Sequence, residues 1–273
     1  MKKMIKYAAL VVLALGLAFT PVQRSDASVG LCDPQQSKLC QGLVEWYDFE
    51  QGPPAVFGSY ANTMLRQGDS VDYISLGTGP TGTNYVKLSG ASYGYLAQPR
   101  VGGFTGGRWT VSLWTYVPAS GWDTAKYTTL FSTRRGVSGV AAAGFLVQLK
   151  YATGWKVNTY CWDDETGTSL NAVNTTALAV GWHMVTISMS PYGPYGKSKI
   201  RIAIDGGAFV DTTMSYLMRA SVMDFTLGHQ DGLACSSENM AYLDGFGIWA
   251  REFDANDVTA NYNSGAGMDF PFY

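Results

Sequence analysis

The chain has 273 residues, of which 47% are hydrophobic and 15% are charged, and its formal net charge is -2. This hydrophobic content excludes a disordered chain. The lack of Lys or Arg runs beyond the first residues excludes the basic surface of a typical nucleic-acid-binding protein. With 32 glycines and 14% aromatic residues, the composition is typical of strands joined by tight turns.

The first 27 residues predict a secretory signal peptide. Lys2 and Lys3 give a basic start, an apolar stretch covers 7–19, and small residues surround Ala27. The apolar stretch is shorter than the about 20 residues that a membrane-spanning helix needs. We therefore expect cleavage after residue 27 and an exported protein, secreted or periplasmic, with no membrane attachment.

The four cysteines predict disulfide bonds, because export places the chain in an oxidising compartment. We expect Cys32 to pair with Cys40 and Cys161 to pair with Cys235, although four cysteines allow three connectivities. Residues 28–41 then form a disulfide-tied N-terminal extension, followed by one domain over 42–273. No Cys or His spacing typical of a zinc site occurs.

Strands are predicted throughout this domain. In the segment 108–117, apolar residues alternate with Thr and Ser, which predicts a strand with one buried face. The predicted strands cover 42–49, 71–76, 85–88, 108–117, 128–133, 144–151, 155–162, 182–190, 198–205, 223–227 and 240–249. One short helix is predicted after the cap Asp254 and ends at Ser264-Gly265. So many strands predict two packed sheets.

Four segments resemble motifs of concanavalin A-like lectin/glucanase domains of the laminin-G-like (LamG) kind. They read GLVEWYDFE at 42–50, RWTVSLWTYVP at 108–118, WHMVT at 182–186 followed by IRIAIDG at 200–206, and LDGFGIWAR at 243–251 followed by YNSG at 262–265. The resemblance implies an all-β, two-sheet antiparallel jelly-roll sandwich. Such domains often bind sugars or proteins and often hold one structural Ca²⁺. The fold alone does not imply an activity.

Catalysis is not expected. The glucanases of this fold carry an E-x-D-x-x-E strand motif that supplies two carboxylates, and this sequence lacks it. The nearest approach, Asp163 and Glu165, reads as a solvated turn. His183 and His229 have no nucleophile-elbow sequence near them and are expected to be structural.

Carbohydrate binding is the favoured hypothesis for the polar strand faces. Aromatic rings stack on sugars, and amides bind hydroxyl groups. The candidate binding residues are Trp114, Tyr116, Gln148, Asn158, Tyr160 and Trp162. The alternative is that Trp114 and Trp162 pack beneath loops, since aromatic residues dominate protein cores.

A structural Ca²⁺ is a further expectation. Asp48 and Asp244 lie in terminal strands that the family pairs, and carboxylates are suitable ligands for Ca²⁺. The alternative is that each aspartate only caps a turn.

The sequence thus predicts a non-catalytic domain that binds a glycan or an extracellular surface. One alternative is a structural or adhesion subunit of an extracellular or virus-like assembly that binds protein partners. A second is a glycoside hydrolase of the laminarinase type with atypical catalytic residues.

Overall fold

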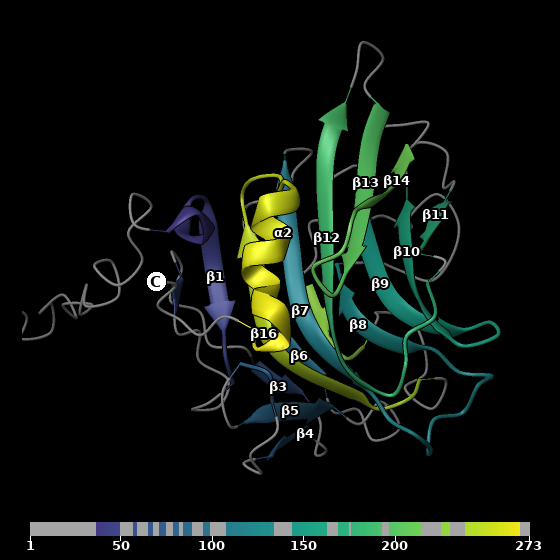
Figure 1. Ribbon diagram of the computed structural model, residues 1–273. Coiled ribbons are helices and arrows are strands. Elements are labelled where there is room, and N and C mark those ends of the chain that lie inside the picture. The colour runs from purple at the N-terminus through teal and green to yellow at the C-terminus, as the bar shows by residue number, and fades with distance from the viewer. Residues whose placement is uncertain are drawn as a thin grey trace, which may run out of the picture. The chain divides into compact units, whose positions relative to one another are not determined.

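A computed structural model shows the arrangement of the chain (Figure 1). The structure describes residues 37–49, 57–58, 65–67, 71–74, 79–81, 84–88, 95–98, 108–133, 144–162, 169–174, 176–192, 197–213, 225–229 and 238–267. All of them belong to the compact unit Cys32–Tyr273, and the other unit is Met1–Leu31. The predicted signal peptide and the residues Cys32, Asp163, Glu165 and Cys235 lie outside the described residues.

The described strands form two antiparallel sheets. The nine-stranded sheet has the order β14-β13-β12-β7-β16-β1-β2, and β5 joins it beside β16 with β4 outside β5. The bounds of its strands are Val210–Thr213 (β14), Lys197–Ile204 (β13), Gly181–Tyr192 (β12), Trp109–Val117 (β7), Ala241–Trp249 (β16), Leu43–Tyr47 (β1), Phe57–Gly58 (β2), Tyr85–Leu88 (β5) and Val71–Ile74 (β4).

The seven-stranded sheet has the order β11-β10-β9-β8-β15-β6-β3. The bounds of its strands are Ser169–Val173 (β11), Trp155–Trp162 (β10), Gly144–Tyr151 (β9), Thr128–Ser132 (β8), Phe225–Leu227 (β15), Tyr95–Gln98 (β6) and Leu65–Gln67 (β3). The predicted all-β fold with two antiparallel sheets is therefore confirmed. The prediction missed the short strands β2, β3, β6, β11 and β14.

The main core lies between the two sheets. Val111 and Leu113 of β7 belong to the same buried cluster as Val147 and Leu149 of β9. Trp109 of β7 meets the β9 side chain Phe145 edge to face, with their ring centroids 4.8 Å apart. These contacts join the inner faces of the two sheets, as expected for a sandwich.

The predicted C-terminal helix is confirmed as α2, Ala255–Tyr262. Asp254 accepts a hydrogen bond from the backbone N–H of Asp257, and the Asp257 side chain accepts one from the backbone N–H of Asp254. This reciprocal capping box satisfies two backbone donors that a helix N-terminus otherwise leaves free. Within the described part of the chain, no helix is long and apolar enough to cross a membrane.

Helix α2 lies across the outer face of the nine-stranded sheet (Figure 1). Asn261 donates a hydrogen bond from Nδ2 to Ser112 Oγ of β7, at 2.8 Å. Next to it, Thr110 of β7 and Ser188 of β12 join their hydroxyl groups at 2.9 Å. The expectation that β7 buries only one face is therefore wrong. Ser112 is buried beneath the helix, and Thr110 is buried beneath the segment that leads into it, where its hydroxyl group bonds the backbone of Arg251 and Phe253.

A second, smaller core lies on this same outer face. It contains Trp46 of β1, Trp249 of β16, Phe253, Val258 of α2 and Leu39. Leu39 belongs to the 3-10 helix η2, Lys38–Cys40. The end of the predicted N-terminal extension thus packs against the sandwich.

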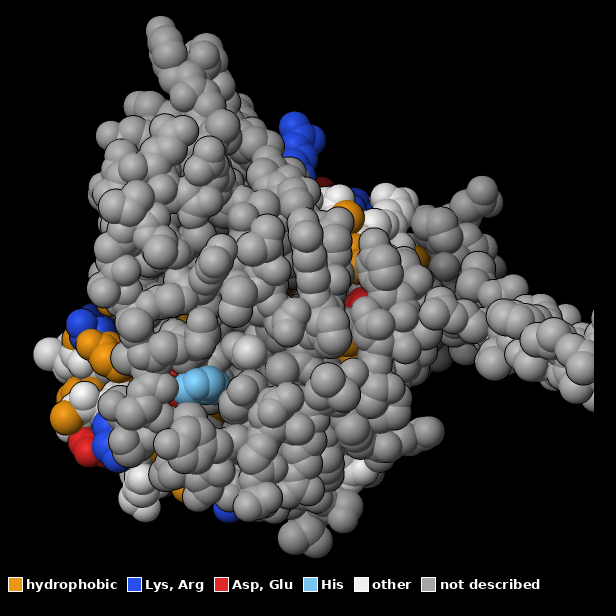
Figure 2. All heavy atoms as spheres, turned by 180° about the vertical axis from the view of Figure 1, so that it is seen from behind, with side chains coloured by type: hydrophobic (Ala, Val, Ile, Leu, Met, Phe, Trp, Pro, Cys, Tyr) orange, Lys and Arg blue, Asp and Glu red, His pale blue; other side chains and the backbone are white. Residues whose placement is uncertain are grey.

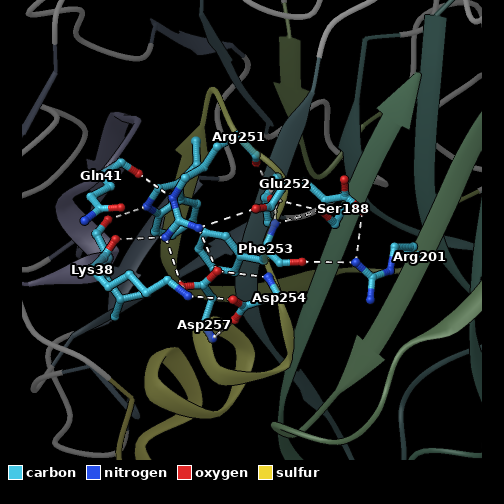
Figure 3. Close-up of polar contacts among 12 residues, drawn as sticks. Lys38, Gln41, Ser188, Arg201, Arg251, Glu252, Phe253, Asp254 and Asp257 are labelled. Atoms are coloured by element: carbon cyan, nitrogen blue, oxygen red, sulfur yellow. Dashed lines mark hydrogen bonds and ion pairs between the residues drawn. The ribbon is translucent and has the colours of Figure 1, made fainter. Parts of the chain in front are cut away.

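Arg251 ties η2 to α2 (Figure 3). Its two Nη atoms donate to the two carboxylate oxygens of Asp257, at 2.7 and 3.1 Å. Its Nε donates to the carbonyl oxygen of Gln41 at 2.6 Å, and Nη2 also donates to that of Lys38 at 2.9 Å. One guanidinium group therefore holds the beginning and the end of the described chain together.

The predicted Cys161–Cys235 disulfide is wrong, because Cys161 is a free thiol. Cys161 points into the core between the sheets, where it is fully buried. Burial raises the pKa of this thiol well above its ordinary value, so the thiol stays protonated. Cys40 is disulfide-bonded, and its pairing with Cys32 stays a prediction because the partner lies outside the described residues.

Candidate functional site

The six predicted carbohydrate-binding residues do not share one surface. Trp114 and Tyr116 lie on β7 of the nine-stranded sheet. Gln148 lies on β9, and Asn158, Tyr160 and Trp162 lie on β10 of the seven-stranded sheet. Because the two sheets face each other across the core, their outer faces point in opposite directions.

Trp114 is not available to a ligand. Its side chain is 3% exposed, and its ring stacks on Tyr262 of α2 with the centroids 5.5 Å apart. The alternative, in which this tryptophan packs beneath another part of the chain, is the one observed. The residue lies on the polar face of β7, but the helix covers that face at this point.

An aromatic cluster lies where the outer face of the nine-stranded sheet continues beyond Trp114. It consists of Tyr85 of β5, Tyr116 of β7, Trp182 of β12 and Tyr242 of β16, which we call the aromatic quartet. The four rings contact one another edge to face, with centroid distances of 5.3, 5.5, 6.1 and 6.3 Å. All four side chains are half-buried, so each ring keeps part of its surface open to solvent.

The quartet also presents polar groups. In the described part of the chain, the hydroxyl groups of Tyr85, Tyr116 and Tyr242 form no hydrogen bond. Partial burial, together with the neighbouring phenols of Tyr85 and Tyr116, raises the pKa of Tyr242. The Tyr242 phenol therefore stays neutral at ordinary pH. Each of the three hydroxyl groups can donate and accept a hydrogen bond.

Gln148, Asn158 and Tyr160 lie on the outer face of the seven-stranded sheet, and we call this group the polar row. Gln148 and Asn158 are register partners on β9 and β10, and each is only 2% exposed. Asn158 donates from Nδ2 to the Tyr160 hydroxyl group at 2.9 Å. The oxygen Oδ1 of Asn158 is buried and has no hydrogen-bond partner among the residues that the structure describes. Trp162 lies on the same strand, outside the residues whose side chains the structure describes.

The polar row continues onto β8. Thr129 is the register partner of Gln148, and its hydroxyl group donates to the buried carboxylate of Glu238. His229 binds the other oxygen of that carboxylate through Nδ1. Sequence reasoning missed Thr129 and Glu238, because only the fold brings residues of these separate segments together. The face that holds this row is turned away from α2, and from that side a histidine is visible (Figure 2).

No catalytic arrangement is present among the described residues of the row. A glycosidase needs two carboxylates on either side of the scissile bond, and Glu238 is the one carboxylate in this row. Both of its oxygens already accept hydrogen bonds, from Thr129 and His229. The pair Asp163 and Glu165 lies outside the described residues.

His183 forms a separate ion pair at the start of β12. Its Nδ1 lies 2.7 Å from Oδ2 of Asp205, and its Nε2 lies 3.0 Å from the carbonyl oxygen of Ala179. Burial lowers the pKa of His183, but the hydrogen bond and charge of Asp205, with the Ala179 carbonyl, outweigh it and raise the pKa above its ordinary value. The pair links two strands and faces no nucleophile in the described chain.

The raised pKa gives a pH-dependent contribution to stability. A group with a raised folded-state pKa contributes its full stability below the unfolded-state pKa, about 6.5, and loses it as the pH rises through the folded-state pKa. We expect His183→Gln to cost about 1 kcal/mol at pH 5 and much less at pH 9. Urea unfolding of both proteins across this range measures the difference. A constant difference between pH 5 and 9 would contradict the assignment.

Asp244, one of the two predicted calcium ligands, is buried and anchors a loop, and calcium binding stays a prediction. Its two carboxylate oxygens accept hydrogen bonds from the backbone N–H and hydroxyl group of Thr81 and from the backbone N–H of Gly245. These donors fix the loop at Thr81 to β16, which favours the alternative that Asp244 anchors a turn. Asp48 lies half-buried just after β1. Among the described residues, no group of three or more His, Cys, Asp or Glu side chains is arranged to hold a metal.

Solved structures with the same fold include toxin binding domains. The botulinum neurotoxin type G receptor binding domain has a TM-score of 0.59 and 15% identity, and the alignment covers 82% of this chain and 51% of the neighbour. For the binding domain of Paraclostridial Mosquitocidal Protein 1 the values are 0.60, 14%, 82% and 52%. For the botulinum neurotoxin serotype D ligand binding domain in complex with N-acetylneuraminic acid they are 0.59, 14%, 81% and 50%.

This chain spans about half the length of these neighbours. Neither a protein-family model nor a curated protein matches the sequence. At this level of identity, the comparisons establish the β-sandwich fold of the chain.

Proposed function

We propose that this protein is an exported, non-catalytic β-sandwich that binds carbohydrate through the aromatic quartet. The observation that carries the proposal is the grouping of Tyr85, Tyr116, Trp182 and Tyr242 on four adjacent strands, all half-buried. The hydroxyl groups of the three tyrosines form no hydrogen bond in the described chain, so they are available to a ligand.

The chemistry of the quartet suits a sugar ring. The C–H faces of a pyranose are apolar and pack on aromatic rings, while its hydroxyl groups need donors and acceptors nearby. The quartet supplies both, since each tyrosine has an apolar ring and a polar tip. Tight ring-to-ring contacts also keep the side chains in place before a ligand arrives, which reduces the entropy cost of binding.

Binding to a panel of neutral polysaccharides, followed by calorimetry on the best oligosaccharide, tests the proposal. Trp182→Ala and Tyr116→Ala are each expected to weaken binding about 10-fold or more, because each removes stacking area from the quartet. Tyr151→Ala is the matched control: Tyr151 is 43% exposed but lies on β9, outside the quartet, and its loss is expected to leave neutral-sugar binding unchanged.

Two results would overturn the proposal. One is that no neutral saccharide binds to the folded protein. The other is that binding occurs but Trp182→Ala and Tyr116→Ala leave it intact. Light scattering distinguishes the structural or adhesion alternative: stable oligomers that dissociate in Trp182→Ala, without glycan binding, would assign the quartet to a protein contact.

A further inference from the structure

Two lysines face each other at one end of the polar row. Lys150 of β9 and Lys156 of β10 are register partners. They lie on the same face as Gln148 and Asn158, because residues two apart on a strand share a face. Lys150 is exposed and Lys156 is half-buried. Within the described chain neither lysine has an acidic partner, and the Lys150 ammonium lies 5.6 Å above the ring of Tyr127.

The pairing of Lys150 with Lys156 destabilises the folded state. Side chains directly opposite each other on antiparallel strands have their Cβ atoms about 5 Å apart, and like charges at that distance destabilise the pair. Another cross-strand pair in this protein has opposite charges: Arg201 of β13 lies directly opposite Asp211 of β14, and the two form an ion pair. An anion placed between Lys150 and Lys156 would turn repulsion into two charge-assisted hydrogen bonds.

A second feature next to the lysines also lacks a partner. Within the described ranges, the oxygen Oδ1 of Asn158 is buried without a hydrogen bond, and a buried acceptor left in this state costs stability. Asn158 lies two residues from Lys156, about 7 Å along the strand. The amide of Gln148 opposite it also forms no hydrogen bond within the described chain. The buried Asn158 oxygen, which can accept a hydrogen bond, therefore lies close enough to the Lys150 and Lys156 ammonium groups for one sugar ring to reach all three.

We infer that this end of the polar row is a second ligand site, which binds an acidic saccharide. The anionic group of the sugar lies between Lys150 and Lys156, and a neighbouring hydroxyl group donates to Oδ1 of Asn158. The rings of Tyr127 and Tyr160, both half-buried, flank the ligand on either side of the amides. This site is separate from the aromatic quartet, which lies on the other sheet.

An acidic saccharide fits these groups better than an acidic peptide does. Lysine pairs bind carboxylates of either kind, and both a sugar hydroxyl group and a peptide N–H can donate to the Asn158 acceptor, so the discrimination depends on the two tyrosine rings. The two tyrosine rings add apolar surface suited to a sugar face.

Calorimetry with four probes tests the inference: an oligogalacturonate, its neutral methyl ester, a sulfated oligosaccharide and polyglutamate. We expect the oligogalacturonate to bind at least 10-fold more tightly than the ester and polyglutamate. The sulfated probe distinguishes the two kinds of anionic group, and whichever anion binds more tightly identifies the group that the lysines prefer.

Variants locate the site. Lys150→Gln and Lys156→Gln are each expected to weaken oligogalacturonate binding about 10-fold, and Lys150→Arg is expected to retain most of it. Lys126→Gln removes the same charge from a nearby loop residue outside the row and is the matched control. Asn158→Leu is expected to weaken binding while the melting temperature stays within a few degrees of the original, since the loss of the hydrogen bond from Nδ2 to Tyr160 is offset by removal of a buried acceptor that the described chain does not satisfy.

Comparing the variants of the two sites distinguishes acidic-sugar binding at the lysines from neutral-sugar binding at the quartet. Trp182→Ala is expected to leave oligogalacturonate binding unchanged, so loss of neutral-sugar binding and loss of acidic-sugar binding arise from different variants. The inference is overturned if the ester binds as tightly as the acid, if polyglutamate binds as tightly as the saccharide, or if Lys126→Gln weakens binding as much as Lys150→Gln does.

Discussion

Replacing Arg251 by methionine is expected to destabilise the protein by about 3 to 5 kcal/mol, because it leaves a buried carboxylate with the exposed Lys38 ammonium as its remaining counter-charge among the described residues. The Asp257 side chain is 1% exposed and is held by Arg251 in a two-bond pair. The same substitution removes the donors to the carbonyl groups of Lys38 and Gln41. Methionine keeps much of the volume, so the loss measures polar contacts rather than a cavity.

Urea unfolding, monitored by tryptophan fluorescence, measures this loss. Lys38→Met is the matched control, because Lys38 also contacts Asp257, at 3.3 Å, but its side chain is 48% exposed. A pair with so exposed a partner contributes at most about 1 kcal/mol. A double-mutant cycle with Asp257→Asn isolates the Arg251–Asp257 coupling. A loss below about 1 kcal/mol for Arg251→Met would show that the guanidinium group does not tie η2 to α2.

Replacing Gly247 by alanine is expected to cost about 3 kcal/mol or more, because the added methyl group has no space. A Cβ atom on Gly247 would lie 2.4 Å from the Trp249 ring and 2.7 Å from the Trp46 ring. Both tryptophans are buried, Trp249 completely and Trp46 with 1% exposure. The rings are rigid and enclosed, so accommodation requires the backbone of β16 to move.

Gly121→Ala is the control for Gly247→Ala. Gly121 has a φ of +92°, and a Cβ atom there would meet nothing within 4 Å. Its substitution therefore reports backbone strain alone, at about 1 kcal/mol. Thermal unfolding of both variants separates steric overlap from strain. Equal shifts in melting temperature would contradict the expected overlap with the two tryptophans.

Residues that recur every second position could be assigned to strands from the sequence, but not to an environment. The alternation in β7 correctly predicts that Val111 and Leu113 share the inner face. It does not reveal that α2 covers the opposite face, where Ser112 and Trp114 are buried. A period of two indicates which side chains point to the same face of a strand. It does not indicate what packs on that face, which here is helix α2, more than 100 residues further along the chain.

Local patterns do not show which distant segments meet, and this explains why the Cys161 prediction was wrong and why the aromatic quartet was not predicted. An even number of cysteines indicates how many bonds are possible, but not that Cys161 points into the core. The quartet joins β5, β7, β12 and β16, whose order in the sheet is not their order in the chain. Tyr116 was a candidate from its strand alone, whereas Tyr85, Trp182 and Tyr242 had no signal that linked them to it.

The sequence by itself determined the strands with a clear period, the capped helix after Asp254 and the two-sheet class, because these depend on residues close together along the chain. The tertiary structure alone decided which outer surfaces are covered. It also decided that the aromatic quartet forms one surface and that Lys150 and Lys156 lie beside an Asn158 oxygen that no described residue pairs with. Those features depend on strand order and on helix placement, which are fixed by packing between distant segments rather than by any local pattern.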